Sequence, residues 1–140
     1  MSASLEAHFL VYLTQLTAKL GKRIDSWLFV HGISFTEFIV MYELDRAVAG
    51  ALPRSKLAEI MGISPSGVTR VLAPMEKNGI TEREKNPRDA RMSLVKLSKT
   101  GKQLFREALA SFEQGAQQLS ASLGPKQLEK IIRQTGELTQ

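Results

Sequence analysis

Two short helical segments joined by a glycine turn lie near the middle of the chain, and they constrain its fold more than any other feature. We expect the first helix to run from about Arg54 to Met61. It should end at Gly62, because glycine readily takes the positive φ that closes such a turn. Ser64 is a good N-cap for the second helix, and Pro65 suits its first position. This order predicts a helix-turn-helix, whose second helix enters the DNA major groove.

The second of these helices is expected to have two different faces. Its buried face is marked by apolar residues at four- and three-residue steps, namely Val68, Leu72 and Met75. Its opposite face carries two small hydroxyls and one cation, namely Ser66, Thr69 and Arg70. Such side chains can approach base edges and phosphates, so we expect them to contact DNA.

A basic hairpin is predicted directly after the helix-turn-helix. Residues 80–85 and 92–97 are β-compatible runs, and residues 86–91 between them form a turn that carries Arg88 and Arg91. A short strand within residues 50–53 could pair with this hairpin. A hairpin in this position is a wing, and its tip can place an arginine in a narrow minor groove.

The helix-turn-helix and the wing together resemble the MarR family of winged-helix transcription regulators. The segment that leaves the second helix reads Met-Glu-Lys-Asn-Gly-Ile over residues 75–80, close to the family's Leu-Glu-x-x-Gly-hydrophobic pattern. The wing supplies the family's spaced motif with Asp89, Arg91, Val95, Leu97, Ser98 and Gly101. The departures are mild: methionine replaces leucine at position 75, and serine replaces threonine at position 98.

Long amphipathic helices are expected on both sides of this region. They should cover residues 4–30, 34–49, 101–123 and 125–138, with a capping box formed by Ser34 and Glu37. The first is longer than a small domain usually needs, so part of its apolar stripe should pack on another subunit. The alternative is that these stripes only complete a monomeric core. In the MarR family the terminal helices interlock into a dimer, and the resemblance implies the same here.

Positive charge is concentrated on the helix-turn-helix and wing. Residues 54–102 hold eleven lysines and arginines against five acids, a net charge of +6, while the rest of the chain carries −1. A concentrated basic face is typical of nucleic-acid binding. We therefore expect DNA contacts from Arg54, Ser64, Ser66, Thr69, Arg70, Arg88 and Arg91. Asp89 is expected to support the wing, and either Arg88 or Arg91 to probe the minor groove.

Several function classes find no support in the sequence. It has no cysteine and only two histidines, so neither a thiol switch nor a classical zinc site is expected. We find no nucleophile elbow, phosphate loop or dinucleotide fingerprint, and expect no enzyme activity and no cofactor. No apolar run is long enough for a membrane span, and no secretion signal is evident, so a cytoplasmic protein, associated with the nucleoid when bound to DNA, is expected.

Small aromatic or anionic effectors commonly bind in MarR-family proteins, in a crevice between the dimer helices and the DNA-binding lobe. The resemblance makes Trp27, His31 and Phe35 candidates for such a pocket. The alternative is that Trp27 and Phe35 belong to the core and His31 is an exposed helix end.

The sequence thus predicts a mainly α fold with a small β-hairpin (α+β), as a single domain over residues 1–140. Residues 34–101 would form a winged helix-turn-helix lobe, and residues 1–31 and 102–140 a helical dimerisation region. The expected function is a homodimeric repressor that binds a palindromic operator and is released by a ligand. Alternatives are a ligand-independent activator or anti-silencer of the same fold, or a winged-helix protein-interaction adaptor.

Overall fold

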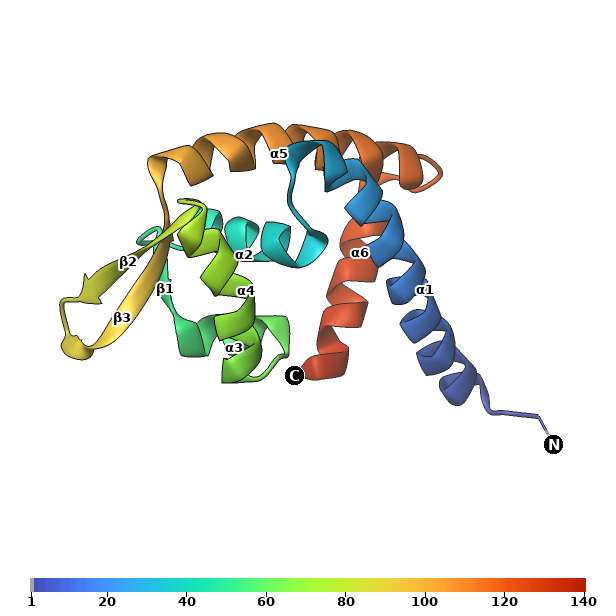
Figure 1. Cartoon of the computed structure of the whole chain (residues 1–140). Coiled ribbons are helices and arrows are strands. Elements are labelled where there is room, and N and C mark those ends of the chain that lie inside the picture. The colour runs from blue at the N-terminus through green and yellow to red at the C-terminus, as the bar shows by residue number, and fades with distance from the viewer. Residues whose placement is uncertain (1) are drawn as a thin grey trace.

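The computed structural model describes residues 2–140, which form a mainly helical protein with one small sheet (Figure 1). The elements are, in chain order, α1 (Leu5–Leu28), the 3₁₀ turn η1 (Phe29–His31), α2 (Phe35–Arg46), β1 (Ala51–Pro53), α3 (Arg54–Met61), α4 (Pro65–Lys77), β2 (Thr81–Asn86), β3 (Asp89–Leu97), α5 (Lys99–Leu119), α6 (Pro125–Gly136) and η2 (Glu137–Thr139). The predicted fold class, mainly α with a winged helix-turn-helix, is confirmed.

The helix-turn-helix has the predicted boundaries. Gly62 takes φ 65° at the end of α3, and the Ile63 amide donates to the Ala58 carbonyl across 3.1 Å. Ser64 caps α4, where its Oγ accepts the Gly67 amide at 3.1 Å. These local bonds satisfy backbone groups that the ends of both helices would otherwise leave unpaired.

The sheet has the strand order β1-β3-β2, and both pairs are antiparallel. Val95 lies at its centre, opposite Leu52 of β1 and Arg83 of β2. The predicted pairing of a short strand before α3 with the wing is therefore confirmed. Strand β1 directly precedes α3, so its pairing with β3 joins the start of α3 to the wing.

The turn at the wing tip contains fewer residues than predicted. Residues 86–91 were expected to form the turn, but only Pro87 and Arg88 do so, and β3 already begins at Asp89. The register shifts sharply here, because Lys85 pairs with Ser93 whereas Asn86 pairs with Asp89. Residues 90–92 of β3 are accommodated as a bulge, a feature that re-aims side chains at the end of a hairpin.

Several helices end earlier than predicted. Residues 29–31 leave α1 as a 3₁₀ turn that Gly32 closes at φ 71°, and α2 ends at Arg46 rather than near Ala49. The Ser34–Glu37 capping box at the start of α2 is confirmed. Helix α5 spans Lys99–Leu119. It begins two residues earlier than expected, because the Ser98 hydroxyl caps it directly, and it ends four residues earlier than expected.

The core lies where α2 packs between α5 and the helix-turn-helix. Phe38 of α2 stacks on Phe112 of α5 with ring centroids 4.6 Å apart, and α4 adds its predicted buried stripe from below. On α2, Val40 is 1% exposed, whereas Tyr42 is 41% exposed. Val40 is buried because α2 meets helices on both sides.

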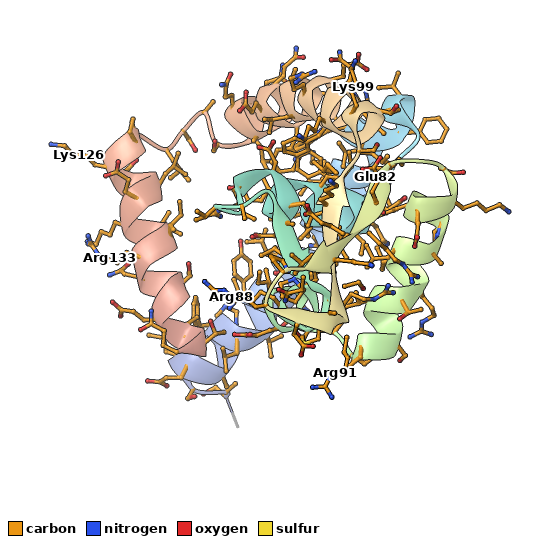
Figure 2. The ribbon with its side chains drawn as sticks, turned by 90° about the vertical axis from the view of Figure 1, so that its left-hand side faces the viewer. Glu82, Arg88, Arg91, Lys99, Lys126 and Arg133 are labelled. Carbon is orange, nitrogen blue, oxygen red and sulfur yellow. The ribbon has the colours of Figure 1, made fainter. Side chains whose placement is uncertain are left out.

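Helices α1 and α6 carry apolar side chains that the single chain leaves exposed. Leu10 of α1 is 57% exposed and Ile132 of α6 is 69% exposed. None of the residues of α6, all within the described part of the chain, is buried. Figure 1 shows both helices at the side opposite the wing, and Figure 2 shows α6 standing apart from the lobe. These two helices therefore offer unpartnered apolar faces.

Candidate nucleic-acid interface

The exposed face of α4 carries the side chains predicted to contact DNA. Ser66, Thr69 and Arg70 are all exposed, while the apolar residues of the opposite face are buried in the core. Ser66 Oγ lies 3.0 Å from the Oγ of the capping Ser64, so both hydroxyls gather at the N-terminus of the helix. Partial positive charge at a helix N-terminus attracts anions.

Arg54 is held against this same face. Its Nη2 donates to Thr69 Oγ1 across 3.3 Å, and Thr69 Oγ1 donates in turn to the Pro65 carbonyl at 3.2 Å. The bonds tie the start of α3 to the first turns of α4. Arg54 is half-buried, so its guanidinium is presented in a fixed place beside the exposed face of α4.

The wing tip presents its two arginines differently. Arg91 is 93% exposed at its side chain, and its Nε lies 3.6 Å from Asp89 Oδ1. Asp89 Oδ1 also accepts the Arg91 backbone amide at 3.0 Å. Arg88 sits in the turn itself, where its amide donates to Asn86 Oδ1. Figure 2 shows both arginines at the free end of the hairpin.

A hollow of about 320 Å³ lies between α4 and the wing. Six residues line it: Arg54, Thr69, Ala73, Glu76, Lys77 and Arg83. We call it the α4–wing hollow. The sequence analysis gave no functional role to Glu76, Lys77 or Arg83. The alternation of acids and bases along residues 82–85 could have indicated that Arg83 lies on a basic face of the strand. Arg83 is held there by Glu76, whose Oε1 lies 3.1 Å from Arg83 Nε.

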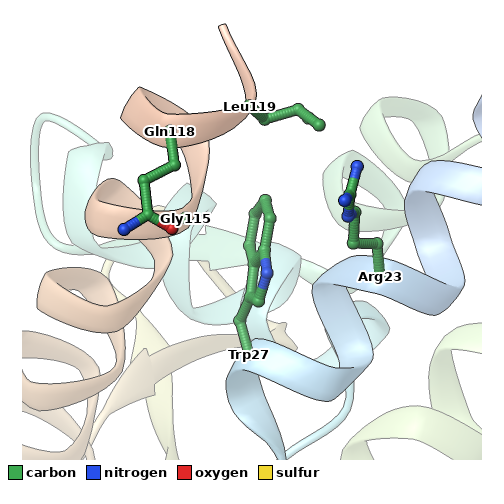
Figure 3. A pocket seen from close by; sticks show the side chains of 5 residues that line it. All are labelled: Arg23, Trp27, Gly115, Gln118 and Leu119. Atoms are coloured by element: carbon green, nitrogen blue, oxygen red, sulfur yellow. The ribbon is translucent and has the colours of Figure 1, made fainter. Parts of the chain in front are cut away.

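A second hollow, of about 280 Å³, lies where α1 meets α5 (Figure 3). It is lined by Arg23, Trp27, Gly115, Gln118 and Leu119, and we call it the Trp27 hollow. In Figure 3 the indole of Trp27 stands between Arg23 of α1 and the residues of α5.

The other two candidate effector residues contact α5 at neighbouring positions. His31 Nε2 lies 2.7 Å from Ser111 Oγ, and the ring of Phe35 stacks on that of Phe112 with centroids 6.3 Å apart. Trp27 meets the same Phe112 ring edge-on at 6.0 Å. The three residues therefore share one α5 surface, but only Trp27 borders the Trp27 hollow.

Two further properties bear on function. Among residues 2–140, no three histidine, cysteine or acidic side chains come together as metal ligands would. Within the same residues, no single helix has the length and apolar character of a membrane span. Only α1–η1 and α2 taken together, at a bend of 77°, meet those two criteria.

Comparison with known proteins places this geometry among transcription regulators. Residues 33–93 match the model of the MarR family. The chain is 32% identical over 105 residues to YwaE and 30% identical over 115 residues to YfiV, both HTH-type transcriptional regulators of Bacillus subtilis. It is also 28% identical to the transcriptional repressor MprA of Escherichia coli. These matches cover 75%, 82% and 84% of the chain, but 60%, 68% and 69% of the relatives, so the chain spans well under the full length of each.

Solved structures share the fold across nearly the whole chain. A MarR-family regulator from Rhodococcus superposes with a TM-score of 0.86 at 16% identity, covering 98% of this chain and 96% of that one. A mutant MarR of Escherichia coli complexed with operator DNA gives 0.80 at 21% identity, with coverages of 97% and 99%. An organohalide-sensing regulator in its 2,4-dichlorophenol-bound form gives 0.81 at 23% identity, with coverages of 98% and 80%. The family and the curated relatives are transcription regulators, not enzymes.

Proposed function

Because the chain belongs to the MarR family of transcription regulators, we propose that it binds double-stranded DNA as a homodimer and represses transcription from a palindromic operator. The observation that carries this proposal is the exposed face of α4 together with two wing arginines, within residues 54–102, which carry a net charge of +6. In this proposal residues 34–101 form the DNA-binding lobe. The protein acts in the cytoplasm, on the nucleoid.

Each polar residue of the interface has a proposed role. Ser66, Thr69 and Arg70 contact base edges or backbone in the major groove, and Ser64 both caps α4 and reaches a phosphate. Arg54 contacts phosphate, since its bond to Thr69 aims it along α4. Three further residues serve the wing: Arg88 as the minor-groove contact, Arg91 as a further DNA contact at the tip, and Asp89 as their support.

The homodimer is supported by the apolar faces of α1 and α6. Residues 1–31 and 102–140 would form the dimer, because a second copy would cover side chains such as Leu10 and Ile132 that one chain leaves exposed. Two lobes related by a twofold axis can each read one half-site, with centres roughly 34–36 Å apart. A twofold protein implies a palindromic operator.

Ligand-dependent release is proposed to act through the junction of α1 and α5. The Trp27 hollow combines an indole ring with the guanidinium of Arg23 and the amide of Gln118. These groups suit a small aromatic anion, because the indole offers a stacking surface and the guanidinium pairs with a carboxylate or phenolate. A ligand there would favour one arrangement of the lobes over another, and so change the separation of the two α4 helices.

The test is a titration of the full chain against the duplex upstream of its own gene, by gel shift or fluorescence anisotropy. We expect saturable binding by a dimer, with a loss of about 10³–10⁵ in affinity between 50 and 200 mM salt for roughly 6–10 phosphate contacts. We also expect 2,4-dichlorophenol or benzoate to weaken the complex, and Trp27→Ala to abolish this effect. Weak, salt-independent binding on operator and random duplexes alike would contradict the proposal. An adaptor protein would behave in that way.

A further inference from the structure

Strand β2 of the wing places its basic and acidic side chains on opposite faces. Successive side chains of a strand point to opposite faces of the sheet, so Arg83 and Lys85 of β2 share one face while Glu82 and Glu84 share the other. The face of Arg83 is the one that meets α4, because Arg83 contacts Glu76. The acids therefore lie away from α4, and the bases of β2 line the side that borders the α4–wing hollow.

The cations of the hollow are held in place by bonds within the protein. Arg54 is bonded to Thr69 at one end, and Arg83 to Glu76 at the other. Within the described residues, the contact of Arg83 uses Nε, so the terminal nitrogens of its guanidinium stay available to a ligand. Lys77 follows Glu76 in the last turn of α4 and also lines the hollow.

We propose that the α4–wing hollow binds backbone phosphates of the DNA duplex, with Arg54, Lys77 and Arg83 as their ligands. This inference rests on the proposed function and extends it to Lys77 and Arg83. Three cations face one carboxylate in the hollow, so its balance is positive. Guanidinium groups match the geometry of a phosphate in a way that few other side chains do.

The position of the hollow points to the same ligand. It lies between the face of α4 proposed for the major groove and the wing proposed for the minor groove. A duplex that engages both must place the sugar-phosphate strand that separates the two grooves between them. That strand carries a phosphate at every nucleotide, so the hollow would meet negative charge whatever the base sequence.

Glu76 is a positioning residue in this arrangement. Its carboxylate engages Arg83 at Nε, at 3.1 Å from Oε1 and 3.3 Å from Oε2, which fixes the plane of the guanidinium. Both side chains are partly exposed, so the pair adds little to stability. Its proposed role is to direct the guanidinium of Arg83 toward the sugar-phosphate strand of the DNA.

The test measures the salt dependence of binding to a labelled duplex of random sequence, so that no operator needs to be known. The variants are Arg83→Gln and Lys77→Gln in the full chain, with Lys96→Gln as the matched control. Lys96 also carries one positive charge on the wing, but it pairs with Glu84 on the opposite face, with 3.9 Å between Nζ and Oε1. Arg83→Lys tests whether the charge alone suffices.

We expect Arg83→Gln and Lys77→Gln each to make the slope of log K against log salt shallower by about 0.9, the value for one lost phosphate contact. Lys96→Gln should keep the wild-type slope, and Arg83→Lys should restore most of it. The inference is overturned if Arg83→Gln and Lys77→Gln keep the wild-type slope, or change it no more than Lys96→Gln does, while the wild type binds in a salt-dependent way. If the wild type itself shows no such dependence, the proposed function fails with it.

Discussion

The indole ring of Trp27 lies directly against Gly115 of α5. A Cβ added at Gly115 would come within 2.5 Å of Cε2 and 2.6 Å of Cε3 of the ring, closer than real Cβ atoms approach. Only glycine therefore lets α5 pass the indole at this distance. The contact joins α1 to α5 at the edge of the Trp27 hollow, between the unpartnered faces of α1 and the DNA-binding lobe.

Gly115→Ala should destabilise the protein despite the higher helix propensity of alanine. Alanine gains about 1 kcal/mol over glycine inside a helix, whereas overpacking typically costs about 1–3 kcal/mol. We expect a net loss of up to about 2 kcal/mol in the free energy of unfolding, measured by urea denaturation at fixed protein concentration. In the Trp27→Ala background the clash is removed, so Gly115→Ala should become stabilising.

Gly21→Ala is the matched control. Gly21 also lies inside a long helix, α1, but an added Cβ would meet nothing within 4 Å. Only propensity should act there, so we expect a gain of about 0.5–1 kcal/mol. Equal effects of the two substitutions would contradict the proposed role of the Trp27 contact.

Features of this structure could be predicted from the sequence where residues close together in the chain determine them. The bounds of α3 and α4 were predicted correctly because Gly62, Ser64 and Pro65 act on backbone within a few residues. The contact of Trp27 with Gly115 could not be predicted, since nothing near either residue marks its partner. The bulge in β3 was also missed, because pairing register depends on both strands at once.

The same distinction applies to the candidate site: what depends on local sequence was predicted, and what depends on contacts between elements was not. Periodicity alone separated Ser66, Thr69 and Arg70 from the buried face of α4, and their exposure is confirmed. The bond from Arg54 to Thr69 and the pairing of Glu76 with Arg83 are contacts between elements, so the sequence left them open. Resemblance to known regulators supplied the family, but it could not supply these geometries.

Ser98 is predicted to hold the wing to the rest of the lobe. Its buried hydroxyl accepts the Gly101 amide at 2.9 Å, which caps α5, and it lies 2.5 Å from the Gly79 carbonyl and 3.1 Å from that of Ile80. Ser98→Ala removes the cap and leaves a buried amide unpaired, so we expect a loss of about 1–3 kcal/mol in the free energy of unfolding.

Ser26→Ala provides the comparison for Ser98. The Ser26 hydroxyl also donates to a backbone carbonyl, that of Arg23, but it does so at the exposed surface of α1. Its removal should change the free energy of unfolding by no more than about 0.5 kcal/mol, as surface substitutions usually do. Chemical denaturation of both variants checks the difference, and a Ser98→Ala variant as stable as Ser26→Ala would refute the wing-holding role.

Arg70→Ala should weaken sequence-specific binding more than non-specific binding. Arg70 lies on the exposed face of α4, where a bidentate contact with a guanine is worth about 1–3 kcal/mol. We expect a loss of about 5- to 150-fold on an operator duplex and a much smaller loss on random DNA. Arg106→Ala, which removes an exposed arginine from α5, is the control and should change neither. Equal losses on both duplexes would identify Arg70 as a phosphate contact.

Arg88→Ala should reduce affinity more than Arg91→Ala. Arg91 is partly engaged by Asp89, whereas Arg88 occupies the turn at the very end of the hairpin. Charge-assisted hydrogen bonds are worth about 1.5–3 kcal/mol, so we expect at least a tenfold loss for Arg88→Ala when an A-tract lies at the wing position. The measurement is anisotropy on duplexes with and without the A-tract. A larger loss for Arg91→Ala would reverse the assignment.

Ile132→Glu should dissociate the dimer without unfolding the lobe. Ile132 is 69% exposed on α6, a helix with no buried residue within the described chain, so a charge there costs the monomer little. In a dimer, the same carboxylate would be buried against apolar side chains without a partner, and buried unpaired charges are strongly unfavourable. Light scattering coupled to gel filtration should show a dimeric wild type and a monomeric variant.

Val48→Glu completes this experiment as its control. Val48 is also exposed, but it lies in the loop between α2 and β1, away from α1 and α6 (Figure 1). The Val48→Glu variant should remain dimeric and keep its affinity for DNA. Ile132→Glu should lose operator affinity through the loss of the second half-site, while each monomer still binds a random duplex weakly. A dimeric Ile132→Glu variant would show that α6 lies outside the dimer interface, and the proposed dimer would then have to form through other residues.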